Sequence, residues 1–204
     1  KPETGGIKNI IFDVGQVLVD YDWETYLDSF GFEPAKRERI AKATFQSPVW
    51  DERDRGLYEE DVYLKQFQEL DPEDAEDIEK VIRGTGGTIH KRPYADTWVK
   101  YLKSKGYHVY ILSNYSSYML DHTKKELTFR REMDGEVFSC YAKQLKPDAE
   151  IYQIILNKYQ LKPEECVFID DRPENCRGAQ EQGIHTICFK DFKQVTADLE
   201  KLGV

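Results

Sequence analysis

Long apolar runs are missing from this sequence of 204 residues. The longest ones, such as 109–112 and 167–169, fall far short of the roughly 20 residues that a membrane-spanning helix needs. The opening KPETGG also lacks the apolar stretch of a secretory signal, so we expect a flexible lead-in there. We therefore predict a protein without a membrane segment.

Cysteine is scarce, and no two cysteines have the spacing of a metal-binding motif. The lack of any CxxC pair argues against a zinc site and against a disulfide framework. Single cysteines in or near apolar stretches are typical of reduced core residues, which predicts a cytoplasmic protein. The four cysteines are Cys140, Cys166, Cys176 and Cys188.

Positive charge is in deficit. Lysine and arginine number 29 against 38 aspartates and glutamates, which gives a formal net charge of −9. Nucleic acids and anionic membranes both bind basic surfaces, so this composition predicts neither as a partner. An anionic small molecule can still bind where local cations or a metal ion overcome the overall field.

Five short segments rich in β-branched and aromatic residues predict strands. Helical patterns separate the last four of them, and Gly106 ends one of these helices. Apolar strands that alternate with helices indicate a parallel sheet covered on both faces. We therefore predict an α/β fold with a Rossmann-like doubly wound sheet of about five strands. The segments are 7–12, 107–112, 136–140, 166–169 and 184–189.

Residues 22–88 interrupt this alternation with charged, amphipathic stretches and no convincing strand. A helical insertion directly after the first strand would lie above the carboxyl ends of the strands, where open α/β sheets bind ligands. We predict a core made of residues 1–21 and 89–204, and a helical cap made of 22–88. The GTGG stretch at 84–87 is a plausible hinge between the two.

Two strands are predicted to end on carboxylates. Asp13 follows the first strand, where it could equally cap a loop, and Asp170 and Asp171 end the strand at 166–169. Adjacent carboxylates repel each other, and a hard divalent cation such as Mg²⁺ removes that conflict directly. Asn175, four residues beyond Asp171, is placed to hydrogen-bond a ligand or a metal-bound water.

Two further segments offer donors for a phosphate group. The strand at 107–112 runs into Ser113 and Asn114, whose hydroxyl and backbone N–H groups can cradle phosphate oxygens. An ordinary helix N-cap is the simpler explanation of this pair taken alone. Lys146 precedes a predicted helix, where its ammonium can neutralise a phosphoryl group. A single lysine before a helix is more often solvated.

Taken together, the stretches FDVGQVLVDYD, LSN, LKPDAEIY and FIDDRPEN resemble the four motifs of the haloacid dehalogenase-like (HAD) hydrolase superfamily. Within it they look most like the C1-capped small bacterial phosphatases that include the α-D-glucose-1-phosphate phosphatase. The resemblance implies Asp13 as the nucleophile and Ser113, Asn114 and Lys146 as phosphate-binding groups. It also implies Mg²⁺ held by Asp13, the carbonyl of Gly15, and Asp171 or Asp170. Counting back from the small residues at 178, 179 and 183 ranks Asp171 first and Asp170 second.

The implied reaction is hydrolysis of a small phosphorylated metabolite through an aspartyl-phosphate, in a protein that we expect to be a monomer or weak homodimer. Most phosphatases of the superfamily carry a general acid two residues after the nucleophile, where this chain has Gly15. Three interpretations remain open. The chain could be a phosphatase for better leaving groups, such as a sugar 1-phosphate, or one that uses water or a cap residue as the acid. It could be a metal-independent dehalogenase, against which the acidic pair argues, or a non-catalytic phosphate binder.

Substrate choice is weakly encoded. The cap stretch SPVWDERDRGLYEED could place Trp50 with Arg53 and Arg55 over the site. A packed tryptophan beside two solvated arginines explains the same residues equally well.

Overall fold

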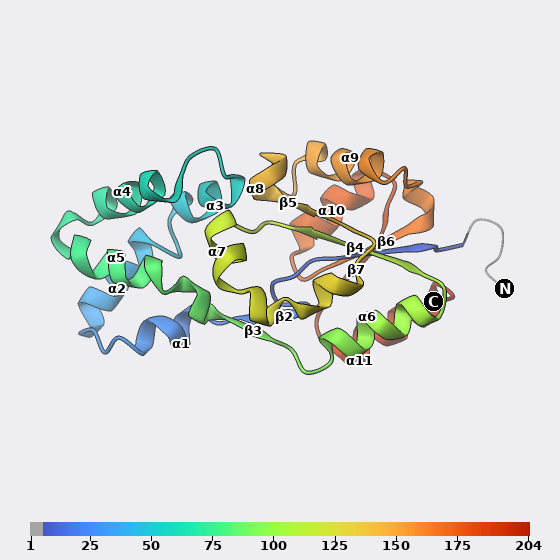
Figure 1. Cartoon of the computed structure of the whole chain (residues 1–204), viewed down its shortest axis with the longest axis horizontal. Coiled ribbons are helices and arrows are strands. Elements are labelled where there is room, and N and C mark those ends of the chain that lie inside the picture. The colour runs from blue at the N-terminus through green and yellow to red at the C-terminus, as the bar shows by residue number, and fades with distance from the viewer. Residues whose placement is uncertain (1–5) are drawn as a thin grey trace.

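The computed structural model describes residues 6–204, so the lead-in expected at residues 1–5 lies outside the described part of the chain. Its centre is a five-stranded parallel sheet in the order β5-β4-β1-β6-β7 (Figure 1). The predicted fold class is confirmed, and all five predicted strands are present. They are β1 (Asn9–Phe12), β4 (His108–Ser113), β5 (Gly135–Phe138), β6 (Cys166–Asp170) and β7 (His185–Cys188).

The two faces of the sheet bury alternate side chains of each strand. Ile10 and Phe12 of β1 face a cluster shared with α6 (Ala95–Ser104) and α11 (Phe192–Lys201). Ile11 faces the opposite cluster, shared with α9 (Ala149–Lys158) and α10 (Pro173–Glu181). Figure 1 shows these two helix pairs on opposite sides of the sheet. Burial on both faces explains why the strands are apolar throughout instead of alternating with polar residues.

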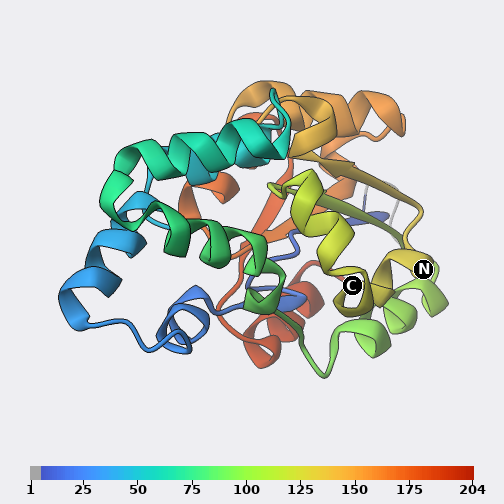
Figure 2. The same cartoon turned by 60° about the vertical axis from the view of Figure 1, so that its left-hand side comes forward.

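The cap region, 22–88, contains helices and no strand. Its helices share a hydrophobic cluster that includes Leu27, Ile40, Phe67 and Ile78. Figure 2 shows them gathered beside the carboxyl end of the sheet, although the exact division into core and cap stays a prediction. The helices are α1 (Trp23–Asp28), α2 (Pro34–Ala43), α3 (Pro48–Arg55), α4 (Glu60–Leu70) and α5 (Ala75–Arg83), with 3₁₀ turns η1 (Pro72–Asp74) and η2 (Thr85–Thr88).

Two short strands join the cap region to the core. β2 (Val19–Tyr21) and β3 (Ile89–Lys91) pair antiparallel where the chain leaves and re-enters the core. The sequence did not predict them, because three residues are too few for a periodic pattern. The prediction that Cys140 ends a strand is also wrong, since β5 stops at Phe138 and Cys140 lies in the short helix α8 (Ser139–Ala142).

The GTGG stretch is packed more tightly than a free hinge would be. A Cβ at Gly84 would lie 2.5 Å from the Tyr26 hydroxyl, and one at Gly86 would lie 2.9 Å from the His122 carbonyl oxygen. These glycines therefore allow close approach between segments. The remaining elements are α7 (Ser117–His122) and the 3₁₀ turns η3 (Lys124–Glu126), η4 (Thr128–Glu132) and η5 (Pro163–Glu165).

No helix within residues 6–204 combines the length and the apolar character that crossing a membrane requires.

Candidate active site

Asp13 lies at the carboxyl edge of the sheet, one residue beyond β1. Its backbone N–H donates to the carbonyl of Ile169 at 2.9 Å, which extends the pairing with β6 by one step. One carboxylate oxygen, Oδ1, accepts from the N–H of Val14 at 2.8 Å. The residue is 8% exposed, so its carboxyl group faces the interior of the site and has little contact with bulk water.

Lys146 connects two of the predicted carboxylates. Its Nζ donates to Asp13 Oδ1 at 2.9 Å, to Asp170 Oδ2 at 2.7 Å and to the carbonyl of Leu112 at 3.0 Å. All three donors of the ammonium are thereby used, and the side chain is 1% exposed. The expectation of a lysine close to the nucleophile is matched by these distances, while its role stays a prediction.

Asn114 holds Lys146 in place. Its side-chain Oδ1 accepts from the Lys146 N–H at 2.9 Å, and its Nδ2 donates to the Lys146 carbonyl at 3.1 Å. This two-way contact fixes the backbone of Lys146 across the end of the sheet. Asn114 also lines the pocket, so it can position the lysine and still present a donor to a ligand.

The two carboxylates of the pair differ in their surroundings. Asp170 is fully buried and accepts from Lys146, from Asn175 Nδ2 at 3.2 Å and from the Arg172 N–H at 2.9 Å. Asp171 is half-buried and lines the pocket, and none of the ion pairs within residues 6–204 involves it. Asp170 is thus already satisfied by protein donors, whereas Asp171 has capacity for a cation. This difference favours the predicted ranking.

The site carries more negative charge than its lysine can balance. Carboxylate oxygens of Asp13, Asp170 and Asp171 lie within 4.8 Å of one another. Burial, together with the charge of Asp170, raises the pKa of Asp13 to about 8 even though Lys146 opposes the shift. Burial and Asp170 likewise raise the pKa of Asp171. Burial alone would lower the pKa of Lys146, but Asp13 and Asp170 together raise it, so the ammonium stays charged. Three oxygen donors with surplus negative charge fit a hard divalent cation.

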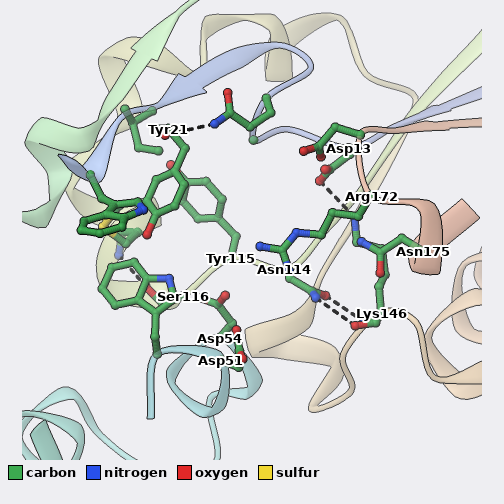
Figure 3. Close-up of a pocket in the computed structure, with 17 residues that line it drawn as sticks. Asp13, Tyr21, Asp51, Asp54, Asn114, Tyr115, Ser116, Lys146, Arg172 and Asn175 are labelled. Atoms are coloured by element: carbon green, nitrogen blue, oxygen red, sulfur yellow. Dashed lines mark hydrogen bonds and ion pairs between the residues drawn. The ribbon is translucent and has the colours of Figure 1, made fainter. Parts of the chain in front are cut away.

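A cavity of about 340 Å³ opens over these groups, between the sheet edge and the cap region (Figure 3). Of the predicted site residues, Asp13, Gly15, Asn114, Lys146 and Asp171 line it, as does Asn175. Asp170 lies behind this surface.

Ser113 and Gly15 add two facts about the site. Ser113 is fully buried and does not line the cavity, and its hydroxyl has no hydrogen-bond partner within residues 6–204. A buried hydroxyl without a partner is unusual, and a ligand oxygen is one way to satisfy it.

At Gly15, an added Cβ would meet nothing within 4 Å. The absence of an acidic side chain there is therefore not imposed by crowding.

Several lining residues were not predicted from the sequence. Arg172 adds a cation beside the acidic pair, and its place directly after Asp171 in DDRPEN was the signal that could have identified it. On the cap side of the cavity stand Tyr21, Trp23, Asp51 and Asp54, for which the local sequence offers no comparable signal.

The three cap residues predicted to lie over the site, Trp50, Arg53 and Arg55, have different surroundings. Trp50 lines the cavity and stacks with Tyr21, with ring centroids 6.1 Å apart. Arg53 is 2% exposed, pairs with Glu60 at 2.6 Å and lies 5.1 Å from the Trp50 ring, so the idea that it is solvated is wrong. Arg55 pairs with Glu52 at 3.0 Å. Neither arginine lines the cavity, and each instead forms an ion pair with a glutamate of the cap region.

Comparison with known proteins agrees with this geometry. Residues 7–183 match the family model of the haloacid dehalogenase-like hydrolases. The chain is 25% identical to flavin mononucleotide hydrolase 1, a chloroplast protein of Arabidopsis thaliana, over 96% of this chain and 77% of that one. It is 26% identical to D-ribitol-5-phosphate phosphatase of Bacteroides thetaiotaomicron, over 88% of this chain and 90% of that one.

A solved structure shares the fold. A HAD family enzyme from Bacteroides thetaiotaomicron, in complex with magnesium and inorganic phosphate, superimposes with a TM-score of 0.73 at 23% identity. The similarity covers 93% of this chain and 99% of that chain.

Proposed function

We propose that this chain, which belongs to the haloacid dehalogenase-like hydrolase family, is a magnesium-dependent phosphatase that hydrolyses a small phosphomonoester through an aspartyl-phosphate on Asp13. The observation that carries the proposal is the arrangement around Lys146. The carboxylate of Asp13 at the sheet edge is bonded to the buried Lys146, beside the carboxylate of Asp171, which takes part in none of the ion pairs within residues 6–204. A phosphate-ester hydrolase activity is also what the two relatives named above carry in their names.

Charge explains why these residues belong together. A carboxylate and a phosphate repel each other, so attack by Asp13 needs cations close to both. Lys146 and Arg172 provide two cations at the cavity. Asp13, Asp171 and the backbone carbonyl of Gly15 would hold Mg²⁺, with Asp170 supporting them. When bound, Mg²⁺ supplies neutralisation of the phosphate oxygens and polarisation of the phosphoryl group.

The chain's own residues would act in two steps. In the first, a carboxylate oxygen of Asp13 bonds to phosphorus while the bond from phosphorus to the ester oxygen breaks. In the second, water attacks the same phosphorus and releases phosphate and free Asp13. Lys146 keeps the Asp13 carboxylate oriented during both steps, and the Ser113 hydroxyl and the Asn114 amide offer donors for phosphate oxygens.

The cap side of the cavity favours a small, hydroxylated substrate such as a sugar phosphate, for example glucose 1-phosphate. Tyr21, Trp23 and Trp50 provide flat aromatic walls, while Asp51 provides an acceptor for hydroxyl groups. A cavity of about 340 Å³ is at the small end of the range for ligand sites. The monomeric or weakly dimeric state and the cytoplasmic location stay predictions, and one relative is a chloroplast protein.

The test is hydrolysis of p-nitrophenyl phosphate and of a panel of sugar and polyol phosphates, with Mg²⁺ and with EDTA. We expect Mg²⁺-dependent phosphate release that is lost in Asp13→Asn, because the amide cannot attack phosphorus. The unfolding temperature of Asp13→Asn would show that the variant is folded.

Two other outcomes would contradict the proposal. Halide release from a 2-haloacid without metal would identify a dehalogenase. Binding of phosphate esters without turnover, with or without Mg²⁺, would identify a phosphate-binding protein.

A further inference from the structure

Hydrolysis of a sugar or alkyl phosphate requires a proton for the departing oxygen, because an alkoxide is a poor leaving group at neutral pH. Position 15, two residues after the nucleophile, has no side chain that could provide one, although the structure has room for it. A donor supplied by the protein would therefore come from elsewhere on the cavity wall.

We propose that the carboxyl group of Asp54 donates this proton, an inference that rests on the phosphatase function proposed above. Asp54 lies in α3 and lines the cavity on its cap side. Figure 3 shows it across the cavity from Asp13. In an in-line displacement the departing oxygen lies on the side of phosphorus opposite the nucleophile, and so it faces the wall that carries Asp54.

Asp54 is held at a point where the cap region and the core touch. Its backbone carbonyl accepts from the Ser139 hydroxyl at 2.6 Å, and the same hydroxyl oxygen accepts from the Tyr115 N–H at 2.9 Å. Two residues further on, a Cβ at Gly56 would lie 2.7 Å from the Cys140 carbonyl oxygen, so α3 ends in close contact with α8. This anchoring places Asp54 on a fixed wall of the cavity, as a proton donor requires.

The carboxyl group of Asp54 is not paired with a cation. The nearby Lys146 forms an ion pair with Asp170, but none of the ion pairs within residues 6–204 involves Asp54. Burial raises its pKa to about 7, against the lowering influence of nearby cations. At neutral pH the group therefore exists in both protonation states, as a proton donor should.

The groups that surround Asp54 determine this balance. The cations are Arg53 on its own helix, Arg172 before α10, and Lys146, and the nearby acid is Asp51. The charge of Asp54 in turn helps to raise the pKa of three neighbours, Tyr21, Tyr115 and Cys140.

Other cavity residues are less suited to the role. Burial raises the pKa of Tyr21 and Tyr115 above the ordinary tyrosine range, so neither gives up a proton readily. Lys146 has all three donors occupied. Asp51 is exposed to solvent, so it is less shielded from bulk water than Asp54.

The proton balance closes over the two steps. When Asp13 bonds to phosphorus, the ester oxygen leaves with the electron pair of its bond and takes the proton of Asp54, which becomes a carboxylate. When water attacks the aspartyl-phosphate, its proton returns to Asp54 and the Asp13 carboxylate is released. No further reactant is needed.

The test compares two esters in wild type and Asp54→Asn, with Mg²⁺ present. One is p-nitrophenyl phosphate, whose leaving group needs little protonation, and the other is the sugar phosphate that the wild type hydrolyses fastest. The ratio kcat/KM reports steps up to departure of the leaving group. We expect kcat/KM to fall by about 10²–10⁴-fold for the sugar phosphate and by less than about tenfold for the nitrophenyl ester.

A pH profile gives a second readout. The donor must be protonated, so kcat/KM of the wild type for the sugar phosphate should fall as pH rises above about 7, and this limb should be absent in Asp54→Asn. Glu52→Gln, on the same helix but exposed and outside the cavity lining, is the matched control and should leave kcat/KM unchanged for both esters.

Equal losses for the two esters, or no loss for the sugar phosphate, would overturn the assignment of Asp54. Failure of the wild type to hydrolyse either ester would instead reject the phosphatase function itself. Activity of Asp54→Asn toward the nitrophenyl ester shows in the same assay that the variant is folded.

Discussion

Replacing Lys146 by methionine tests whether this lysine holds the acidic cluster together. The substitution keeps a long, flexible side chain but removes the ammonium that bonds Asp13, Asp170 and the Leu112 carbonyl at 2.7–3.0 Å. Because the lysine is 1% exposed, water cannot take over these contacts without opening the site. The carboxylates are then left buried without their cation.

The cost should be large. Removing one partner of a buried ion pair destabilises a protein by about 3–5 kcal/mol. For a chain of this length, one kcal/mol corresponds to about 2–4 °C in unfolding temperature. We therefore expect the unfolding temperature of Lys146→Met in EDTA to be about 6–20 °C below that of the wild type.

The size of this deficit should depend on pH. The folded-state pKa of Asp13 is already raised to about 8, above its ordinary value of 3.8, and loss of Lys146 removes an influence that lowers it. A carboxyl group with a raised pKa binds more protons in the folded state, so its stability contribution is lost as pH rises. The difference in unfolding temperature between wild type and variant should therefore be smallest and constant below about pH 8, where Asp13 is protonated in both folded proteins, and should widen as the pH rises above about 8.

Differential scanning calorimetry or circular dichroism in EDTA measures both effects, and Lys125→Met is the control for loss of a lysine. Lys125 is exposed. A deficit below about 1 kcal/mol, or one that widens as the pH falls, would refute the view that Lys146 balances buried carboxylates.

Three further predictions concern the same region. Asp13→Asn should raise the unfolding temperature in EDTA at about pH 8, since it removes a carboxylate whose ionisation burial opposes; an unchanged or lower temperature would contradict this. Mg²⁺ at about 100 times its dissociation constant should stabilise the wild type by about 2.7 kcal/mol. In Asp171→Asn, thermal scans with and without Mg²⁺ should coincide, and a full shift would exclude Asp171 as a ligand. Gly56→Ala should cost about 1–3 kcal/mol in urea unfolding, because Gly56 has a φ of 70° and an added Cβ would lie 2.7 Å from the Cys140 carbonyl oxygen. An unchanged urea midpoint would show that the contact between α3 and α8 relaxes freely.

Local pattern predicted the core of this protein well. Five apolar segments separated by helical patterns were enough to predict a doubly wound parallel sheet, because burial on both faces leaves a mark on each strand separately. The strands β2 and β3 escaped prediction, since each has three residues and depends on its partner for stability.

The candidate site was predictable in its membership but not in its connections. Asp13 and Asp170 end neighbouring parallel strands, whose carboxyl ends necessarily meet at one edge of the sheet. Which groups pair there is a different matter. The bond from Lys146 to Asp13 spans 133 positions of sequence, and no local pattern encodes it.

What the sequence determined by itself was therefore the sheet, the helical character of residues 22–88 and the set of polar residues at the strand ends. Only the tertiary structure decided that Asp170 is satisfied by protein donors while Asp171 takes part in no ion pair within residues 6–204, that Arg53 is buried in the cap region, and that Asp54 faces the cavity. The reason is physical. Backbone periodicity is fixed by neighbours along the chain, whereas the burial and charge of a side chain depend on segments that only folding brings together.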